Sequence, residues 1–342
     1  MPTDARIRRG ALIGAGGVAR QSHHPAYVGS PAVARRLQVV VAVDGAPDVP
    51  DIPGLPRVAD AAGLAAFAPL DFIDVCTPTA SHVELVLWGL ERGWHVLCEK
   101  PVATTRADAE RVADAARRAG RVVVPCHQYR FNPAWLKLRQ WLDAGRIGRW
   151  HLAEFQTYRL HADPGAASGA GVTPWRGTRA AGGGGVLLDH GTHLLYLLDD
   201  VAGAPSLVHA WTGRLRHRAY DVEDTAQVLL EYPGGRLATI FVTWAANRRE
   251  NVIRFVGERG TIAWVGGELS LDAEDGTERV DFTAALDKAA YKDWFARLFV
   301  EFATAMEHGA AEAPLREIAA VADVLERAYE AAAGSPPLAL VP

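Results

Sequence analysis

Cysteine is scarce in this chain, with 3 in 342 residues, an odd number without paired spacing. Stabilising disulfides need paired cysteines and an oxidising compartment, so we expect free thiols and a cytoplasmic location. Small buried packing residues explain all three, which fall at predicted strand ends: Cys76, Cys98 and Cys126. Apolar runs of about 18 residues, the length of a membrane span, are missing. The N-terminal run MPTDARIRRGALIGAGG lacks the apolar stretch of a signal peptide, so no membrane partner is predicted.

Dense stretches of lysine and arginine are absent as well. The net charge is −4 and the isoelectric point about 6.3, which argues against a nucleic-acid partner. We find no internal repeat, low-complexity domain or coiled-coil heptad. Apolar residues are abundant, at 49% of the total with 10 tryptophans, enough for a large core. The length suggests one large or two ordinary domains.

Residues 1–126 alternate short apolar strands with helical segments, and we expect them to form one domain. The segments 81–93 and 105–120 have apolar residues at helical spacing. Near-continuous Val, Ile and Leu strands that alternate with helices indicate a doubly wound parallel sheet covered on both faces, the Rossmann arrangement of the α/β class. The Pro- and Gly-rich segment 45–56 is predicted to be a loop. The expected strands are 10–16, 37–44, 71–77, 93–100 and 120–126.

Residues 127–342 have a different pattern and are predicted to form a second domain, of the α+β type. A helix over 132–145 is followed by longer strands, and the turns YPGGR and VGGE are typical of hairpins. This order predicts a large, mainly antiparallel sheet with helices on one face and the other face open. Two further helices are expected over 286–308 and 314–333. The expected strands are 149–160, 206–215, 224–232, 236–245 and 251–265.

The sequence GAGGVA places Gly14, Gly16 and Ala19 in G-x-G-x-x-A spacing, after a predicted strand and before a predicted helix. Gly14 permits a tight turn, Gly16 lets the backbone approach a pyrophosphate, and Ala19 keeps the helix close to the sheet. The helix N-terminus would meet the anion with its N–H groups and its dipole. The motif alone also fits a structural turn, but the strand–turn–helix context indicates dinucleotide binding.

Asp44 ends the second predicted strand, 30 positions after Gly14. This spacing is longer than the usual value of about 20, and the segment SHHPAYVGSP between them resembles an insertion. A carboxylate at this place can accept hydrogen bonds from both ribose hydroxyls and would repel a 2′-phosphate. Asp44 therefore predicts NAD rather than NADP as the cofactor. We assign His23 and His24, which lie in the insertion, to helix packing.

The stretch HVLCEKPVA, residues 95–103, ends an apolar strand with Glu99, Lys100 and Pro101. The carboxyl ends of parallel strands form the crevice in which ligands bind, so these residues lie where the nicotinamide is expected. A lysine there can hydrogen-bond a substrate hydroxyl, and the proline would fix the turn that orients it, through a cis bond if the turn requires one. The alternative is a surface lysine in an ordinary loop.

In GGGGVLLDHGTHLLYLLDDV, residues 182–201, Asp189, His190 and His193 interrupt an apolar helical segment. Asp189 and His193 are four positions apart, which places both on one face of an α-helix. Oxidation of an alcohol needs a base for the hydroxyl proton, and a neutral histidine can accept it near neutral pH. A polar patch at a domain interface would give the same pattern. His190 could suggest a metal site, but no metal-binding motif accompanies it, and we expect no metal.

Other candidates have a structural role as an equal alternative. Thr77 and Pro78 end a predicted strand beside the cofactor site, and His82 opens the next helix, where it could serve only as a cap. Arg130 could face the pocket or pair with a carboxylate. The long irregular segment 161–180 is typical of a binding loop. In or beside it lie Tyr158, Arg159, Trp175 and Arg176, residue types that suit a sugar ring or an acidic or phosphorylated sugar.

Four stretches in order, GAGGVA, CTPTASHVELVLWGLERGWHVLCEKPVATT, YRFNPAWLKLRQWLDAGRIG and GGGGVLLDHGTHLLYLL, make the chain resemble the glucose–fructose oxidoreductase and inositol dehydrogenase (Gfo/Idh/MocA) family. The resemblance covers nearly the whole chain, and the combination of EKP with D-x-x-x-H is more specific than the glycine motif. It implies a Rossmann domain followed by an α/β domain with an open sheet. It also implies NAD(P)-dependent oxidation or reduction at a carbinol carbon of a sugar or cyclitol, without a metal. The catalytic lysine of the family falls on Lys100, and its aspartate and histidine fall on Asp189 and His193.

These observations predict an NAD-dependent dehydrogenase or reductase that acts on the CH–OH group of a polyol or sugar. We expect Lys100 to hold the developing alkoxide, His193 to transfer the proton and Asp189 to orient the substrate or support His193. The expected cofactor-binding residues are Gly14, Gly16, Gly17, Val18, Asp44, Thr77, Pro78, His82, Glu99, Lys100 and Gln128. The expected substrate-binding residues are Arg130, Tyr158, Trp175, Arg176, Asp189, His190 and His193. Two alternatives stay open: a non-catalytic dinucleotide-binding regulator, and a redox-neutral lyase or epimerase with bound NAD.

The strands between residues 206 and 265 carry many apolar side chains, including Trp211, Phe241, Trp244 and Trp264. Helices can cover only one face of such a sheet, and a second apolar face would be unusual on a monomer. We therefore predict that these sheets pack together in a homodimer, or in a homotetramer built from such dimers.

Overall fold

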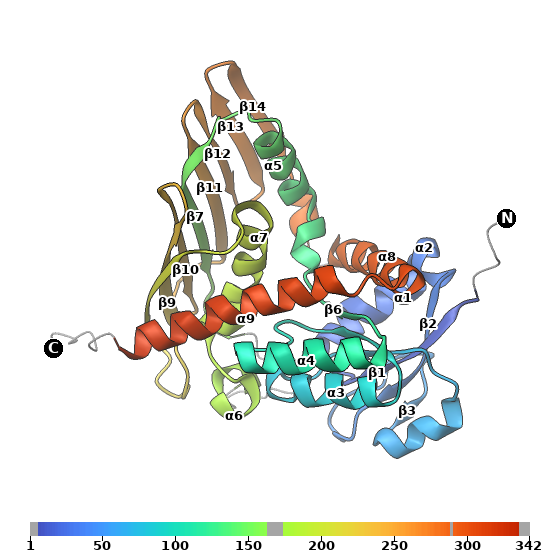
Figure 1. Cartoon of the computed structure of the whole chain (residues 1–342). Helices are drawn as coiled ribbons and strands as arrows, with labels where there is room; N and C mark the ends of the chain where they lie inside the picture. Colours follow the sequence, from blue (N-terminus) through green and yellow to red (C-terminus); the bar gives the residue numbers. More distant parts are fainter. Residues whose placement is uncertain (1–5, 163–173, 288–289, 335–342) are drawn as a thin grey trace. The chain divides into compact units, whose positions relative to one another are not determined.

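A computed structural model describes residues 6–162, 174–287 and 290–334 of the chain (Figure 1). These residues form two compact units. The first contains the described parts of Met1–Gln128 and Lys288–Ala319, and the second contains those of Tyr129–Asp163, Thr173–Asp287 and Ala320–Pro342. The C-terminal part of the chain thus contributes to both units, whereas the sequence pattern suggested one boundary between residues 126 and 127.

The first unit is built on a six-stranded parallel sheet with the strand order β3-β2-β1-β4-β5-β6. The order reverses between β1 and β4, so right-handed crossovers on either side of this point place helices on opposite faces. The predicted doubly wound sheet is confirmed, with the two-residue edge strand β3 as an addition. Its strands are β1 Arg8–Ile13, β2 Leu37–Val43, β3 Arg57–Val58, β4 Phe72–Val75, β5 His95–Cys98 and β6 Val123–Pro125.

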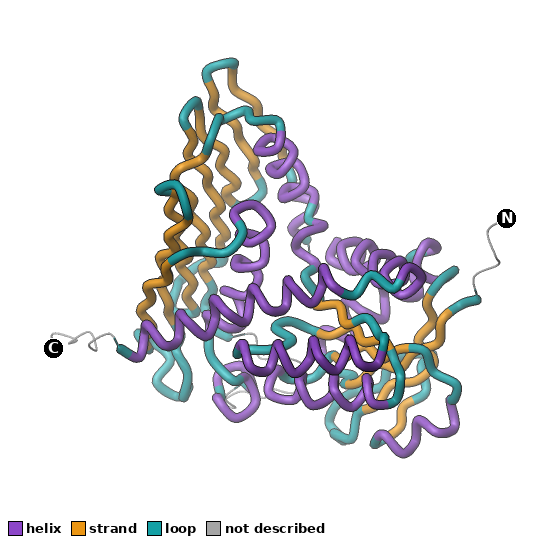
Figure 2. Tube along the Cα trace, viewed as in Figure 1, coloured by secondary structure: helices purple, strands orange, loops and turns teal. Residues whose placement is uncertain are grey.

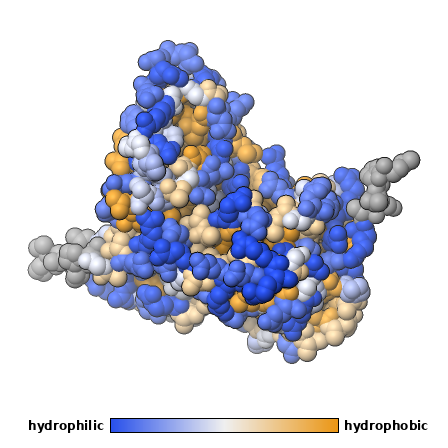
Figure 3. Space-filling view, in the orientation of Figure 1, coloured by the Kyte–Doolittle hydropathy of each residue, from blue (hydrophilic) through white to orange (hydrophobic). Residues whose placement is uncertain are grey.

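Two groups of helices belong to this unit. Helices α1 (His24–Gly29), α2 (Pro31–Ala34) and α8 (Tyr291–His308) pack together, and α3 (His82–Glu91) packs against α4 (Arg106–Ala119). The exposed side of α4 is hydrophilic in Figure 3, as its Arg, Asp and Glu residues require. Helix α8 was expected in the second domain. Its apolar stripe showed that the helix is buried, but could not show which sheet receives it; Phe295, Phe299 and Phe302 are buried in the first unit.

The second unit contains an eight-stranded sheet with the order β14-β13-β12-β11-β7-β10-β9-β8 (Figure 2). Every neighbouring pair is antiparallel except β7 with β10, which confirms the predicted mainly antiparallel sheet. The expected strand 251–265 is two strands joined by a tight turn, and β13 and β14 were not predicted. The strands are β7 Trp150–Tyr158, β8 Leu207–Gly213, β9 Thr225–Tyr232, β10 Arg236–Thr243, β11 Glu250–Gly257, β12 Gly260–Val265, β13 Glu268–Ala273 and β14 Gly276–Asp281.

Helices cover one face of this sheet. Side chains of α5 (Pro133–Asp143), α7 (Thr192–Ala202) and α9 (Glu312–Ala333) share one buried apolar cluster with the inward residues of the strands. Figure 1 shows α5 and α7 on the same side of the sheet. Among the aromatic residues singled out from the sequence, Trp244 and Trp264 are buried in this cluster.

The opposite face, which we call the open face, is mixed in character. Trp211 and Phe241 are only partly buried there, and the register places Phe241 beside Gln156. Glu154 and Arg254 form an ion pair across two strands of this face, at 2.5 Å. The rim of the sheet at the left of Figure 3 shows hydrophobic among hydrophilic atoms. The large apolar residues that are exposed on these strands are Leu152, Leu207, Leu237 and Val265.

Short helical turns complete the described chain. Two are π-helical, η1 (Ala19–His23) and η6 (Leu187–Gly191), and both lie in segments that carry predicted site residues. No helix of the described residues combines the length and the apolar character of a membrane span. The remaining short elements are η2 Ala61–Phe67, η3 Thr79–Ser81, η4 Gln128–Phe131, η5 Trp175–Gly177, α6 Arg179–Gly182 and η7 Thr283–Leu286.

Candidate functional site

The glycine-rich turn after β1 has a required glycine and two glycines beside open space. Gly14 has φ +94°, and a Cβ there would lie 3.0 Å from the carbonyl carbon and oxygen of Cys76, so this turn needs glycine for its own shape. A Cβ added to Gly16 or Gly17 would meet no atom of the described residues within 4 Å. Packing against the described residues therefore does not explain their lack of side chains. This lack fits the close approach of a phosphate group to the backbone.

Asp44, the first residue after β2, holds this turn in place. Its Oδ2 accepts a hydrogen bond from the N–H of Ala15 at 2.8 Å, and its Oδ1 accepts one from the N–H of Ala46 at 3.0 Å. A carboxylate has about four acceptor positions, so two remain for ribose hydroxyls. The long spacing from Gly14 is explained by α1 and α2, which occupy the segment that resembled an insertion.

Two buried polar atoms of the first unit have no hydrogen-bond partner among the described residues. They are Nε of Arg20 and Oε1 of Gln128. Arg20 follows the glycine motif directly in η1, and Val18 precedes that turn as its N-cap. An unsatisfied buried donor and acceptor are costly unless a ligand or water completes them. Gln128 is a predicted cofactor residue, whereas the sequence analysis did not single out Arg20, which directly follows GAGGVA.

The loop after β4 is connected to the loop after β5 through His82. Its Nδ1 lies 2.7 Å from the carbonyl oxygen of Pro101 and its Nε2 lies 2.9 Å from that of Thr77. Burial lowers the pKa of His82, with its two backbone hydrogen bonds opposing the shift. The ring is 1% exposed, so it can serve a cofactor only by holding these loops. Thr77 also shares a hydrogen bond of 2.7 Å with Ser81, and Pro78 is exposed.

The strand end that carries the predicted lysine has a cis bond between Lys100 and Pro101. Lys100 is partly buried, and Glu99 is 8% exposed. The Glu99 carboxylate accepts from the N–H of Lys100 at 3.3 Å and lies 2.9 Å from Nε2 of His23. Glu99 is therefore bound within the protein through both of its oxygens, which limits its predicted role toward a cofactor.

The three cysteines are buried and free, as expected for packing residues. Burial raises the pKa of the Cys76 thiol to about 12, and burial also raises the pKa values of Cys98 and Cys126 well above their ordinary value. The thiolate is the reactive form of cysteine. These side chains are consequently poor nucleophiles at neutral pH.

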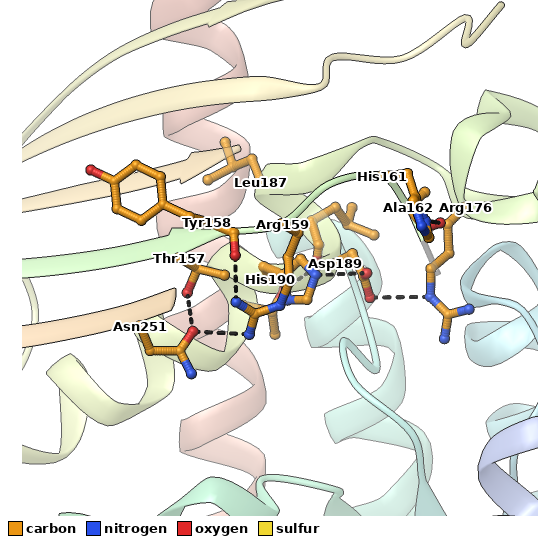
Figure 4. Close-up of polar contacts among 12 residues, drawn as sticks. Thr157, Tyr158, Arg159, His161, Ala162, Arg176, Leu187, Asp189, His190 and Asn251 are labelled. Atoms are coloured by element: carbon orange, nitrogen blue, oxygen red, sulfur yellow. Dashed lines mark hydrogen bonds and ion pairs between the residues drawn. The ribbon is translucent and has the colours of Figure 1, made fainter. Parts of the chain in front are cut away.

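Asp189 and His190 lie in the π-helical turn η6 of the second unit (Figure 4). Asp189 Oδ1 is 3.4 Å from Nε of Arg176, and its Oδ2 is 3.7 Å from Nε2 of His190. The Arg176 guanidinium also stacks on Trp175, 4.2 Å from the ring centroid. The structure thus joins four predicted substrate residues into one polar group.

His193 has different partners from Asp189. It is 7% exposed, stacks on Tyr129 with ring centroids 4.1 Å apart, and places Nδ1 2.8 Å from the hydroxyl of Tyr196. The sequence analysis placed Asp189 and His193 on one face by α-helical spacing. Asp189 lies in the π-helical turn η6, whereas His193 lies in the first turn of α7, so the two residues belong to helical segments of different repeat.

Glu223 explains the last glycine of the run before η6, Gly185. A Cβ on Gly185 would lie 2.0 Å from the Glu223 carbonyl oxygen, so only glycine fits this approach. Oε1 of Glu223 accepts from the N–H groups of Gly185 and Leu187, at 3.0 and 3.2 Å, and from the Tyr329 hydroxyl at 2.8 Å. Burial raises the pKa of Glu223, with these hydrogen bonds opposing the shift. Glu223 and Tyr329 were not found from the sequence, since their partners are distant along the chain.

Two further candidates have structural partners. Tyr158 donates to Gln156 at 3.0 Å on the open face and points away from Asp189 in Figure 4. Its neighbour Arg159 is 7% exposed and donates to the carbonyl of Glu250 and to the side chain of Asn251, at 3.1 and 2.9 Å. Arg159 is buried whereas Tyr158 lies on the open face, as expected for neighbouring side chains that alternate between the faces of a strand. Residues 163–173 of the predicted binding loop lie outside the described residues.

Arg130 contacts a carboxylate, which was one of the two roles that the sequence analysis left open for it. Its guanidinium lies 3.7 Å from Oδ1 of Asp200, which also pairs with Arg139.

In the described part of the chain, one group of side chains has metal-ligand chemistry, His23, Asp74 and Cys126. This group is in the first unit and does not include His190.

Two family profiles match the chain. The profile described as "Oxidoreductase family, NAD-binding Rossmann fold" matches residues 8–127, and "GFO/IDH/MocA C-terminal domain" matches residues 135–263. Together they cover most of the chain in the expected order. The chain belongs to the Gfo/Idh/MocA family.

Curated relatives include several sugar dehydrogenases. The D-glucoside 3-dehydrogenase of Escherichia coli is 30% identical over 207 residues, which are 56% of this chain and 57% of the relative. The levoglucosan dehydrogenase of Pseudarthrobacter phenanthrenivorans is 26% identical over 219 residues, 56% of this chain and 54% of the relative. The matches thus span about half the length of these relatives.

Solved structures agree with the fold over nearly the whole chain. An oxidoreductase from Agrobacterium radiobacter in complex with NAD+, L-tartaric acid and magnesium has a TM-score of 0.82 at 22% identity, with 97% of each chain covered. Levoglucosan dehydrogenase in complex with NADH and levoglucosan has a TM-score of 0.81 at 20% identity, covering 95% of this chain and 97% of the other. A 3-ketoreductase from Actinomadura kijaniata was solved with NADP, at a TM-score of 0.79, 22% identity and coverage of 95% and 98%.

Proposed function

We propose that this protein is an NAD-dependent dehydrogenase or reductase that acts on a CH–OH group of a sugar, a cyclitol or a sugar derivative. The observation that carries the proposal is the glycine turn, where Gly16 and Gly17 face open space and Asp44 fixes the backbone. The resemblance to the family also places its catalytic lysine, aspartate and histidine on Lys100, Asp189 and His193. A protein that only binds a dinucleotide has no use for this combination.

When bound, the nicotinamide ring would supply or accept the hydride. The side chains of the chain do the remaining work. The ammonium of Lys100 donates to the reacting oxygen and stabilises the negative charge that grows on it in the transition state. His193 takes the hydroxyl proton during oxidation and returns it during reduction. Asp189, paired with Arg176, orients substrate hydroxyls.

The partner of His193 determines which ring nitrogen can act as the base. The Tyr196 oxygen accepts a hydrogen bond from the N–H of Tyr129 at 3.1 Å and retains acceptor capacity. If Nδ1–H of His193 donates to this oxygen, Nε2 keeps its lone pair and can accept the substrate proton. The proposed base is therefore Nε2. In this arrangement Tyr196 selects the tautomer, and the Tyr129 ring restricts rotation of the imidazole.

The substrate class rests on the polar group around Asp189. A carboxylate, a guanidinium and an imidazole lie together beside the Trp175 ring. Hydroxyl groups of a sugar can hydrogen-bond to the carboxylate, the guanidinium and the imidazole. The apolar face of a sugar ring can stack on the Trp175 ring. The sugar dehydrogenases among the relatives support this class. NAD is preferred over NADP because Asp44 would repel a 2′-phosphate.

The test is a panel of cyclitols, aldoses, uronic acids and sugar nucleotides, incubated with the protein and NAD or NADP and followed by NADH absorbance. We expect turnover with at least one class, and faster with NAD. Binding of NAD without turnover of any compound would favour the regulator. Conversion of a substrate without net change in NADH absorbance would favour a lyase or epimerase.

A further inference from the structure

A histidine outside the proposed reaction lies buried between two carboxylates in the first unit. Nδ1 of His23 is 2.8 Å from Oδ2 of Asp74, and its Nε2 is 2.9 Å from Oε1 of Glu99. The side chains of His23 and Asp74 are 0% exposed, and that of Glu99 is 10% exposed. The sequence analysis assigned His23 to helix packing, so this ionic contact is a finding of the structure.

The two contacts together require a charged ring. An ionised carboxylate only accepts hydrogen bonds, so both ring nitrogens must carry protons. Burial by itself lowers the pKa of His23, but the charge of Asp74 and its hydrogen bond raise that pKa well above its ordinary value. For Glu99, burial has the opposite effect and raises the pKa. The hydrogen bond and the charge of His23 nevertheless lower the pKa of Glu99 below its ordinary value. Both directions favour an imidazolium held by two carboxylates.

The neighbours of the ring complete this picture. The Tyr27 hydroxyl donates to Oδ2 of Asp74 at 3.0 Å, and Cys76 Sγ lies 3.3 Å from Nδ1 of His23. Phe295 and Phe299 of α8 pack on the ring, with centroids 4.5 and 5.4 Å away. Water is therefore excluded from the ion pairs.

The same group could be mistaken for a metal centre, because His23, Asp74 and Cys126 have ligand atoms within 4.8 Å of one another. A zinc ion lies about 2.0–2.3 Å from each ligand, so tetrahedral ligand atoms are roughly 3.3 Å apart or more. The distance of 2.8 Å from Nδ1 of His23 to the Asp74 carboxylate is that of a direct hydrogen bond. An ion pair explains the geometry without a metal.

His23 joins two parts of the proposed cofactor site. It is the last residue of η1, the turn that follows the glycine motif, and Asp74 lies in β4. Glu99 follows β5, and its second oxygen accepts the N–H of Lys100 at 3.3 Å. The chain of contacts from His23 through the Glu99 carboxylate thus ends at the backbone of the proposed catalytic lysine.

We propose that His23 is a positioning residue for Lys100, acting through the Glu99 carboxylate that it holds between the glycine turn and the end of β5. The inference rests on the proposed function, because Lys100 matters only if it contacts the reacting oxygen. Without the imidazolium, Glu99 would be a buried carboxylate without its cation. It would then take up a proton or turn toward another donor, and the backbone at Lys100 would follow.

Lys100 can be observed directly by NMR, because the chain has only four lysines, Lys100, Lys137, Lys288 and Lys292. Reductive methylation of the folded protein with ¹³C-formaldehyde keeps the charge of each lysine and gives few signals in an NMR spectrum. The Lys100→Arg variant assigns the signal of interest by its loss. This measurement needs neither cofactor nor substrate.

Three variants separate positioning from stability. His23→Gln removes the cation and keeps a polar side chain of moderate size. Tyr27→Phe is the matched control, since it removes a hydrogen bond to Asp74 in the same buried group of side chains and leaves the contacts of Glu99 in place. The double variant of His23→Gln with Glu99→Gln removes the carboxylate that would otherwise lack its partner. Thermal unfolding of each variant measures the general loss of stability.

We expect His23→Gln to shift or broaden the Lys100 signal and to lower kcat by up to about 100-fold, as small displacements of reacting groups do. Tyr27→Phe should lower the melting temperature but leave the Lys100 signal and kcat close to those of the unmodified protein. The double variant should recover part of the Lys100 signal and part of kcat, because it no longer contains a buried carboxylate without its cation. Such linked effects are not additive.

A Lys100 signal that is the same in His23→Gln as in the unmodified protein would overturn the inference, even if the enzyme were active. So would equal changes in His23→Gln and Tyr27→Phe, which would show a general effect of stability. If the signal shifts in His23→Gln alone but the unmodified protein turns over no substrate, the positioning stands and the proposed function fails.

Discussion

The substitution Gly16→Ala tests the proposed dinucleotide site most sharply, because it should separate binding from folding. A Cβ at Gly16 would meet no atom within 4 Å among the residues that the structure describes, and Gly16 is not among the glycines with positive φ. Alanine therefore fits the free protein. It also restricts the unfolded chain, so the free energy of unfolding should stay the same or rise by up to about 1 kcal/mol.

The cost should appear when NAD binds. A methyl group at a surface that must close on a pyrophosphate resembles an overpacked core position, which costs about 1–3 kcal/mol. Since about 1.4 kcal/mol corresponds to a factor of ten, the dissociation constant of NAD should rise roughly 5- to 150-fold. Isothermal titration calorimetry measures this constant, and urea unfolding measures stability on the same preparation.

Two other glycines are matched controls. Gly29→Ala is also free of contacts within 4 Å but lies outside the motif, so it should leave NAD affinity unchanged. Gly14→Ala should destabilise the fold itself, because Gly14 has φ +94° and its Cβ would press on the backbone of Cys76. If Gly16→Ala bound NAD as tightly as the unmodified protein, the pyrophosphate would not approach this turn and the assignment would be wrong.

Four further predictions follow from the same geometry. Lys100→Ala and His193→Ala should each lower turnover by about 10²–10⁴-fold in steady-state kinetics while NAD still binds, and Lys100→Arg should not restore activity; near-normal turnover in both alanine variants would favour the regulator. Asp44→Asn keeps an acceptor for the turn but removes the charge, so calorimetry should show a smaller preference for NAD over NADP; equal affinities in the unmodified protein would refute this. Tyr329→Phe removes a hydrogen bond to a buried carboxylate and should lower the free energy of unfolding in urea by about 1 kcal/mol; an unchanged value would argue against an anchoring role. Phe241→Arg places a charge on the open face and should convert the predicted homodimer into monomers by light scattering; a monomer mass for the unmodified protein at micromolar concentration would contradict the assembly.

Much of the fold could be predicted from local pattern. The parallel strands β4 and β5 are buried on both faces and therefore read as short apolar runs. Alternating strands such as β9 and β10 have one covered face, and their hairpin turn contains two glycines with positive φ, Gly234 and Gly235. By contrast, β13 and β14 escaped prediction because they lie at the end of the sheet, where half or more of the side chains are polar or exposed.

Site residues whose role depends on the backbone could be found in the same way. Gly14, Gly16 and Asp44 act through turn geometry and charge at strand ends, and sequence spacing reports both. At Asp189 and His193 the sequence analysis assumed one α-helix, whereas the structure has a π-helical turn at Asp189 followed by α7 at His193. Nothing in the local sequence distinguishes five residues of a π-turn from five of an α-helix.

The sequence by itself determined the order of strands and helices, the glycine turn and the identity of the chemical groups. Only the tertiary structure decided which buried polar groups meet. His23 is 51 residues from Asp74 and 76 from Glu99, and Glu223 is 106 residues from Tyr329. Each of these contacts forms because a buried charge or hydroxyl must find a partner once water is excluded. The choice of partner depends on how the sheets and helices pack, which no short stretch of sequence encodes.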